Sequence, residues 1–188
     1  MESAQEILAA AELVFISEGL AGASMSQIAE RAGVAVGTLY NRFKDREALL
    51  QALLAQRRAE LLEEIEAAAQ RVGSFALRER LTGVVQTVLL QCEQHRPFLR
   101  LVLASEWAHG PSKEAMLRGL RERLEAVLAP SGSEASGELR PDPERSFPVL
   151  LLCLVRGMLE RDRYGLPLLD AAAGATQIVE FFLKGAGR

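Results

Sequence analysis

The sequence predicts an all-α fold, and three properties of the chain support this prediction. Helix-forming residues, above all Ala, Leu, Glu, Arg and Gln, are prominent along its whole length. No long stretch alternates apolar and polar residues with β-branched enrichment, as a half-buried strand would. Hydrophobic residues make up 49% of the 188 residues but aromatic residues only 5%. We therefore expect a core built mainly from Leu, Val and Ala, as in a helix bundle.

The first helix is predicted over residues 4–18. Ser3 and Glu6 form a capping-box pattern, in which two side chains three residues apart bond the backbone at a helix start. Behind them, apolar residues recur at helical spacing as far as Gly19. We expect this helix to brace the segment that follows it and to make no contact with nucleic-acid bases.

A second, shorter helix is predicted directly after it. Ser24 and Gln27 form another capping-box pattern, and Gly33 stands where helices commonly end in a left-handed residue. The helix between them is therefore only about two turns long. Its small apolar side can pack on a neighbour while its polar residues face water.

The third helix, at 36–43, has one apolar side and one polar side. Leu39 and Phe43 are four residues apart and therefore share a face. The remaining surface carries hydroxyl, amide and guanidinium groups, which suit phosphates and base edges. Two short helices joined by a glycine also occur in many proteins that bind no nucleic acid, so the spacing alone leaves both interpretations open. The polar residues are Thr38, Tyr40, Asn41 and Arg42.

The charge of this region differs from that of the whole chain. The formal net charge is −3 and the pI is about 5.6. Residues 1–30 contain five Glu and no Lys or Arg, whereas residues 31–46 contain four basic residues and one Asp. Local charge decides what a surface attracts, so a nucleic-acid partner is compatible with the acidic total. A patch this small predicts weak, strongly salt-dependent binding to random DNA.

A long helix is predicted over 46–71, where apolar residues recur without an intervening Gly or Pro. Asp45 is its expected N-cap. Arg46 lies in the first turn, where a cation and the helix N-terminus can together hold a phosphate oxygen. The alternative for Arg46 is a solvated surface charge. Because the helix is continuous, it can transmit a displacement that a flexible linker would absorb.

The last two helices differ from the others in their apolar content. Residues 147–155 are apolar on nearly all sides, and small residues at 171–175 allow a neighbouring helix to approach closely. These helices are therefore candidates for a subunit interface, with burial inside one chain as the alternative. Beyond residue 71, helices are predicted at 77–95, 98–107, 112–128, 144–162 and 168–184, with a mobile Pro-, Ser- and Gly-rich loop at 129–143.

The two cysteines suggest no metal or redox site. Cys92 and Cys153 lie in apolar helical runs, and the chain has no C-x-x-C pair and no clustered His. We interpret them as buried thiols in a reducing compartment and expect no cofactor. The longest apolar run, 147–155, is too short to span a bilayer, and the N-terminus lacks a signal-peptide pattern. A cytoplasmic location is expected.

Polar residues inside apolar helical stretches mark where a pocket between helices would orient a ligand. Arg156 interrupts one such run and, if it faces inward, favours an anionic or carbonyl-bearing ligand. Its alternative is an ordinary intrahelical pair with Glu160. Trp107 and Met116 are more commonly core residues than ligand contacts. The pocket candidates are Thr87, Gln91, Trp107, Met116 and Arg156.

Many N-terminal positions follow one known pattern in order. They are Phe15, Glu18-Gly19-Leu20, Ala23-Ser24-Met25-Ser26-Gln27-Ile28-Ala29, Ala32-Gly33-Val34, Gly37-Thr38-Leu39-Tyr40 and Phe43-Lys44-Asp45-Arg46-Glu47-Ala48-Leu49-Leu50. Through these residues the first part of the chain closely resembles the N-terminal domain of the TetR family of transcriptional regulators. The resemblance implies a three-helix, helix-turn-helix DNA-binding domain at 1–47. It also implies a helical ligand-binding and dimerisation domain at 48–188, with about nine helices in all.

The resemblance further implies a homodimeric, ligand-responsive regulator, most often a repressor. Each protomer would place the helix at 36–42 in the major groove of a pseudopalindromic operator. The dimer would form through the last two helices, at about 144–162 and 168–184, and a small, largely apolar effector would release the DNA. The residues that this resemblance assigns to DNA binding are Ser26, Gln27, Val36, Gly37, Thr38, Tyr40, Asn41, Arg42, Lys44 and Arg46.

Two positions depart from the family pattern. Ala35 stands where many relatives cap the third helix with Ser or Thr, and Val36 stands where a polar residue or Pro is common. A missing cap costs on the order of 1 kcal/mol and removes a possible phosphate donor. Val36 could instead contact a thymine methyl group. A second hypothesis is therefore a helical interaction protein that has lost DNA binding.

An enzyme is the third hypothesis. Cys92 or Cys153 would be the nucleophile and His95 or His109 the base. Nothing in the sequence marks an oxyanion site or an orienting carboxylate, so this hypothesis is the weakest of the three.

Overall fold

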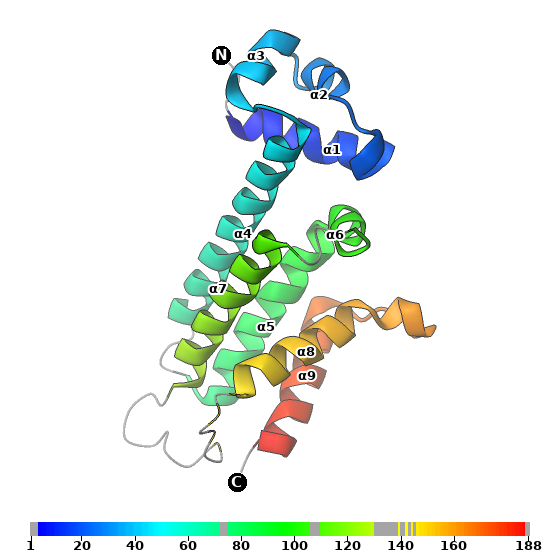
Figure 1. The fold of residues 1–188 in the computed structure, drawn as a ribbon. Helices are drawn as coiled ribbons and strands as arrows, with labels where there is room; N and C mark the ends of the chain where they lie inside the picture. The colour runs from blue at the N-terminus through cyan, green and yellow to red at the C-terminus, as the bar shows by residue number, and fades with distance from the viewer. Residues whose placement is uncertain are drawn as a thin grey trace. The chain divides into compact units, whose positions relative to one another are not determined.

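The computed structural model describes residues 4–71, 75–105, 110–129, 139, 142, 144 and 146–186. Within these ranges the chain forms nine α-helices and one 3-10 helix, which confirms the predicted all-α fold (Figure 1). The helices are α1 (Ala4–Gly22), α2 (Met25–Arg31), α3 (Val36–Arg42), α4 (Arg46–Arg71), α5 (Leu77–Gln94), α6 (Arg96–Leu103), α7 (Pro111–Leu128), α8 (Phe147–Leu159), η3 (Arg161–Tyr164) and α9 (Ala171–Ala186).

The chain divides into two compact units. The first contains residues 1–60 and 95–116, and the second contains residues 61–94 and 117–188. From the sequence we placed a boundary at residue 47, whereas the unit that holds the helix-turn-helix extends farther along α4 and also includes α6. Each unit has its own buried residues.

The core of the first unit is built by α1, α2, α3, the first part of α4, and α6. The apolar sides of the first four helices bury Phe15, Ile28, Leu39 and Leu49 completely. Phe98 of α6 is equally buried in the same core. A helix far along the sequence therefore helps to hold the N-terminal helices together.

The bounds of α1 and α6 in this unit differ from the sequence expectation, and α6 ends at Leu103, ahead of the predicted end at residue 107. α1 continues to Gly22, across a non-helical backbone at Gly19 with φ of 77° and ψ of 163°. Glycine adopts a positive φ without the steric cost that other residues meet. α6 begins at Arg96, ahead of the predicted start at residue 98, with Pro97 in its first turn. Proline is tolerated there because the first amide groups of a helix have no partner inside the helix.

In the second unit, α9 packs against α5 and α8. The rings of Phe147 in α8 and Phe182 in α9 meet edge to face, with centroids 5.6 Å apart and an interplanar angle of 85°. A Cβ atom at Gly174 of α9 would lie 3.1 Å from Cδ1 of Leu89 in α5. A small residue at this position therefore allows α5 and α9 to approach closely.

The prediction of two buried cysteines is wrong for Cys153, which is exposed, and Cys92 is only half-buried. The apolar composition around Cys153 indicated burial, but Cys153 lies on an exposed side of α8. Val149 and Leu150 are exposed on this helix too. Ser3, Trp107, His109 and most of the loop predicted at 129–143 lie outside the described residues. In the described part of the chain, none of the helices has the length and apolarity needed to cross a membrane.

Candidate nucleic-acid interface

The two ends of α2 are fixed by local hydrogen bonds and backbone geometry. The Gln27 amide donates to Oγ of Ser24 at 3.2 Å, and the Ser24 amide donates to Oε1 of Gln27 at 2.9 Å. This reciprocal pair is the predicted capping box. Beyond the helix, Gly33 has a φ of 69°, the left-handed conformation expected of the residue that ends a helix. The turn between α2 and α3 therefore follows from residues next to it in the sequence.

A single fully buried side chain, Leu39, anchors α3 to the first unit. Tyr40, beside it, is 51% exposed, and Val36 at the start of the helix is 39% exposed. No side chain caps α3, since its N-cap is Ala35. The predicted lack of a cap is confirmed. Most of the surface of α3 is thus available to a partner.

All ten residues that the sequence assigned to DNA binding are exposed in the first unit. They come from α2, from α3 and from the turn that leads into α4, and α2 packs directly on α3. Near its start, α4 is capped by Asp45, whose Oδ1 accepts a hydrogen bond from the Ala48 amide at 2.7 Å. This confirms the predicted N-cap. The residues are Ser26, Gln27, Val36, Gly37, Thr38, Tyr40, Asn41, Arg42, Lys44 and Arg46.

Arg46 makes a contact that sequence reasoning missed. Its Nη1 donates to the backbone oxygens of Ala21 at 2.5 Å and Ala23 at 3.2 Å. Arg46 therefore ties the first turn of α4 to the connection between α1 and α2. No local pattern signals this bond, because its acceptors are backbone groups more than twenty positions earlier.

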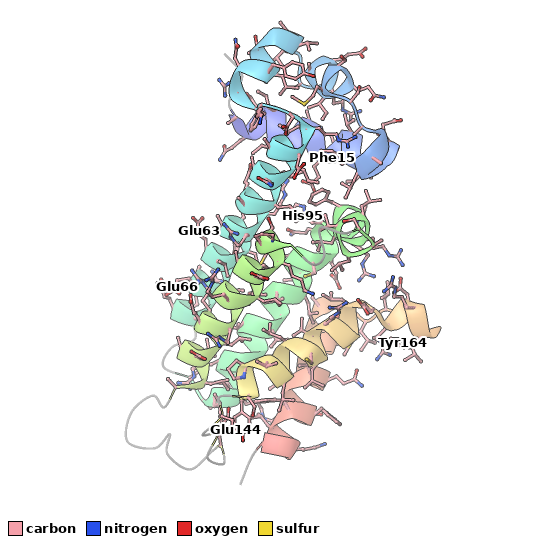
Figure 2. All side chains as sticks on the ribbon, in the orientation of Figure 1. Phe15, Glu63, Glu66, His95, Glu144 and Tyr164 are labelled. Carbon is pink, nitrogen blue, oxygen red and sulfur yellow. The ribbon has the colours of Figure 1, made fainter. Side chains whose placement is uncertain are left out.

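A partly buried ion-pair cluster joins α1, α4 and the start of α6 in the first unit. Glu12 of α1 accepts a hydrogen bond from Nε of Arg57 at 2.9 Å and contacts Nη2 of the same guanidinium. Its other oxygen lies 3.0 Å from Nδ1 of His95, the N-cap residue of α6 that is labelled in Figure 2. Glu12 was not predicted as a site residue. Its position between Leu8 and Phe15 on the apolar side of α1 was the available signal.

The electrostatics of Arg57 follow from its neighbours in α1 and α4. Burial disfavours the charged guanidinium, but hydrogen bonds and charge interactions with Glu12 and Glu60 outweigh burial. Together they raise the pKa of Arg57 above its ordinary value. Arg57 donates to Glu60 at 2.6 Å, so one guanidinium bridges two carboxylates.

The residues predicted to contact a ligand lie in different surroundings. Arg156 pairs with Glu160 at 3.3 Å, and its side chain is 59% exposed, which confirms the intrahelical alternative. Thr87 donates to the Gly83 carbonyl within α5 at 2.9 Å. Gln91 and Met116 are half-buried, and Trp107 lies outside the described residues.

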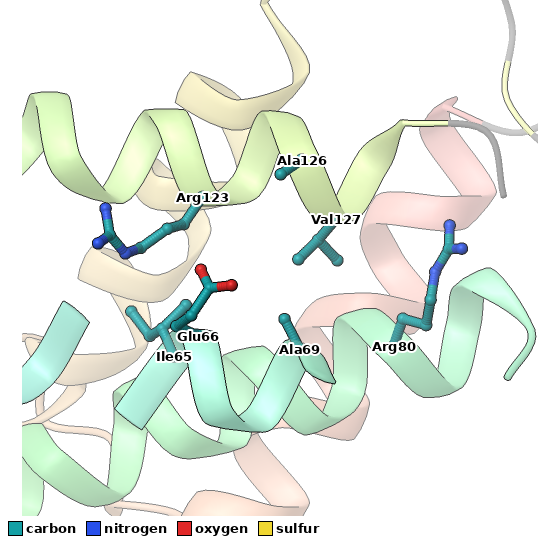
Figure 3. A pocket seen from close by; sticks show the side chains of 7 residues that line it. All are labelled: Ile65, Glu66, Ala69, Arg80, Arg123, Ala126 and Val127. Carbon is teal, nitrogen blue, oxygen red and sulfur yellow. The ribbon is translucent and has the colours of Figure 1, made fainter. Parts of the chain in front are cut away.

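A pocket of about 120 Å³ lies in the second unit between α4, α5 and α7 (Figure 3). Figure 3 shows the guanidinium groups of Arg80 and Arg123 on opposite sides of it, directed away from each other. Arg123 donates from Nε to the Leu62 carbonyl at 3.1 Å. The two cations therefore do not converge on one ligand position. The residues lining the pocket, none of them predicted from the sequence, are Ile65, Glu66, Ala69, Arg80, Arg123, Ala126 and Val127.

Known proteins resemble this chain in sequence and in fold. Residues 7–53 match the family model of the bacterial regulatory proteins, tetR family. An uncharacterized HTH-type transcriptional regulator of Mycobacterium tuberculosis is 26% identical over 179 residues, covering 92% of this chain and 88% of the relative.

Solved structures show the same fold. SmeT, the repressor of the Stenotrophomonas maltophilia multidrug efflux pump SmeDEF, has a TM-score of 0.77 and 21% identity, covering 100% of this chain and 92% of SmeT. The transcriptional regulator FadR from Bacillus subtilis, solved in complex with stearoyl-CoA, has a TM-score of 0.73 and 18% identity. That match covers 97% of this chain and 99% of the FadR chain.

Proposed function

This chain belongs to the tetR family of bacterial regulatory proteins, and from that premise we propose that it is a dimeric, ligand-responsive transcriptional repressor. The observation that carries the proposal is the exposure of α3. Leu39 alone is fully buried there, while Thr38, Tyr40, Asn41 and Arg42 stay at the surface. Hydroxyl, amide and guanidinium groups on one short helix suit base edges and phosphates in a major groove.

The proposed dimer forms through α8 and α9. On α8, Val149 and Leu150 are 49% and 48% exposed, and on α9 Phe181 is 69% exposed. Large apolar side chains on the outer sides of two adjacent helices favour association with a second copy of the same surface. A two-fold dimer requires a pseudopalindromic operator, because each protomer reads one half-site.

The proposed effector is a small, largely apolar molecule. One protein of similar fold supports this proposal: the regulator FadR was solved with stearoyl-CoA, whose long stearoyl chain is apolar. An effector that prefers a conformation with badly spaced α3 helices would release the operator. Of the predicted ligand contacts, we retain Thr87 and Gln91, which both lie on α5 of the second unit, as candidates for its pocket. We expect the protein to act in the cytoplasm, where its DNA lies, without a cofactor or a catalytic residue.

A helical interaction protein that has lost DNA binding remains the second candidate. The acidic net charge of −3 and the uncapped start of α3 at Ala35 favour it. A titration of random duplex DNA at low salt separates the two. A regulator binds such DNA weakly and loses it as salt rises, whereas the second candidate shows no binding at any salt concentration.

Operator recognition is tested on a site selected from random DNA. We expect Tyr40→Ala to bind the selected duplex at least about fivefold more weakly, because a lost base or phosphate contact costs about 1–3 kcal/mol. Fluorescence anisotropy measures the affinity and analytical ultracentrifugation checks that the dimer is intact. Tyr164→Ala removes a tyrosine of the second unit that is even more exposed, at 75%, and should bind normally. Wild-type affinity in Tyr40→Ala would contradict the proposed role of α3.

Arg46→Ala needs a separate control, because the arginine also bonds the Ala21 and Ala23 carbonyls. If Arg46 neutralises a phosphate, its loss makes the slope of log affinity against log salt concentration shallower by about one, because about one ion fewer is released on binding. If it only braces α1 against α4, affinity falls while the salt dependence stays unchanged.

A further inference from the structure

Glu12 is a carboxylate placed where an apolar side chain is expected. It is only 7% exposed and lies on α1 among Leu8, Ala11 and Phe15, which are all buried. Carboxylates are rarely buried in this way unless they are paired, because removing a charge from water costs several kcal/mol. The position therefore needs a specific partner.

Two other elements of the first unit supply that partner. Arg57 of α4 binds one Glu12 oxygen through Nε at 2.9 Å and also through Nη2. His95, which precedes α6, approaches the other oxygen through Nδ1 at 3.0 Å. Glu60 and Gln56 complete the cluster, with Gln56 donating to Glu60 at 2.7 Å. Two carboxylates thus face one guanidinium and one imidazole.

The cluster joins helices that also meet through apolar side chains and through the hydrogen bonds from Arg46 of α4 to the Ala21 and Ala23 carbonyls. Phe98 and Val102 of α6 are buried in the same core as the apolar side of α1. Apolar contacts are non-directional and tolerate small displacements, whereas a charged hydrogen bond requires its partners at defined distances and angles. Glu12 therefore adds directional bonds that restrict the position of α1 relative to Arg57 of α4 and to His95 at the start of α6.

We propose that Glu12 is a positioning residue for operator binding, and that its contacts with Arg57 and His95 hold α1, and with it the DNA-binding helices, in the orientation that binds the operator. The proposal rests on the proposed function, since it concerns how the same DNA-binding helices are held. Without the His95 contact, the buried carboxylate of Glu12 has one hydrogen-bond partner fewer. The bonds that align α1 on α4 weaken as a result, and α3 loses its fixed orientation.

The first test compares operator affinity in matched variants. Glu12→Gln keeps the side-chain shape and removes the charge, and we expect it to bind the selected operator about tenfold more weakly. Glu18→Gln makes the same change at an exposed position of the same helix and should leave affinity unchanged. His95→Ala removes the contact from the α6 side and should weaken binding in the same direction.

A double-mutant cycle decides whether the two residues act as one unit. The combined Glu12→Gln, His95→Ala variant should lose less affinity than the product of the two single losses, because the second change removes a contact that is already broken. Purely structural damage at two separate places would multiply instead. Wild-type affinity in Glu12→Gln, or multiplicative losses in the double variant, would overturn the proposal.

Hydrogen exchange separates this proposal from the proposed function. At a temperature where every variant is fully folded, Glu12→Gln and His95→Ala should each accelerate amide exchange in both α1 and α6 but not in α9. If wild-type protein fails to prefer the selected operator over random duplex, the proposed function fails. Acceleration confined to the mutated helix would overturn the positioning role of Glu12 whichever way the operator experiment falls.

Discussion

Ala35 leaves the first turn of α3 without a side-chain acceptor. Its backbone is extended, with φ of −65° and ψ of 142°, which is the conformation of an N-cap residue. The preceding helix shows what is missing, since Ser24 accepts from the Gln27 amide there. At the start of α3 the Thr38 amide donates only to the Ala35 carbonyl, at 2.9 Å, and no side chain adds a cap to the helix.

We predict that Ala35→Ser stabilises the first unit by about 1 kcal/mol, because a serine hydroxyl accepts from an amide in the first turn of α3. Urea unfolding monitored by circular dichroism measures the change. Ala35→Val alters the side chain without adding an acceptor and should give no such gain. Equal stability of the serine and valine variants would show that capping does not limit α3.

At the scale of elements, charged side chains of α4 lie close to charged side chains from other parts of the chain. Burial by itself would raise the pKa of Glu60, but hydrogen bonds from Gln56 and Arg57 and the charges of Arg57 and His95 outweigh burial and lower it. A carboxyl group with a lower pKa in the folded chain adds stability above its unfolded pKa. That stability is lost as the pH falls through the folded pKa.

The expected consequence is a pH-dependent effect of Glu60→Gln. Its destabilisation should be complete at neutral pH and shrink below the ordinary glutamate pKa of about 4.3, where the wild-type carboxylate also becomes neutral. Urea midpoints measured from pH 7 down to about pH 3 test this. Glu63→Gln, at an exposed position farther along α4, serves as the control. A difference between wild type and Glu60→Gln that does not vary with pH would contradict the assignment.

At the scale of the whole molecule, the exposed apolar sides of α8 and α9 favour assembly. Phe181 is the most exposed large apolar side chain on α9, and Phe182 beside it is buried against α8. Adjacent residues on one helix thus have different functions: Phe182 packs within the chain and Phe181 is available to a second copy. Aromatic side chains of this kind commonly dominate the binding energy of interfaces.

Phe181→Asp is expected to shift the protein from dimer to monomer, because it would place a charge in the apolar interface. Sedimentation equilibrium measures the dissociation constant, which should rise at least about tenfold. Leu117→Asp makes the same kind of change at an exposed position on α7 and should leave the dimer intact. Unchanged dimerisation of Phe181→Asp would place the interface elsewhere.

Interactions between residues that are close in the sequence specify the helices and most of their ends. Ser24 with Gln27, Gly33, and Asp45 with Ala48 act over three residues or fewer, so the pattern that signals each of them contains all the interacting groups. The intrahelical pair of Arg156 and Glu160 is also local, because its partners are four residues apart on one helix. The surface of α3 could also be predicted, because Leu39 defines its buried side.

Which groups far apart in the sequence meet depends on how the helices pack against one another. Glu12 pairs with residues 45 and 83 positions later in the chain, and α6 joins the core of the N-terminal helices. Helix packing likewise explains why Arg46 binds backbone carbonyls and why Cys153 is exposed. Helix caps depend on neighbours in sequence, whereas burial and ion pairing depend on how helix faces pack. The periodicity of one helix does not specify its partner.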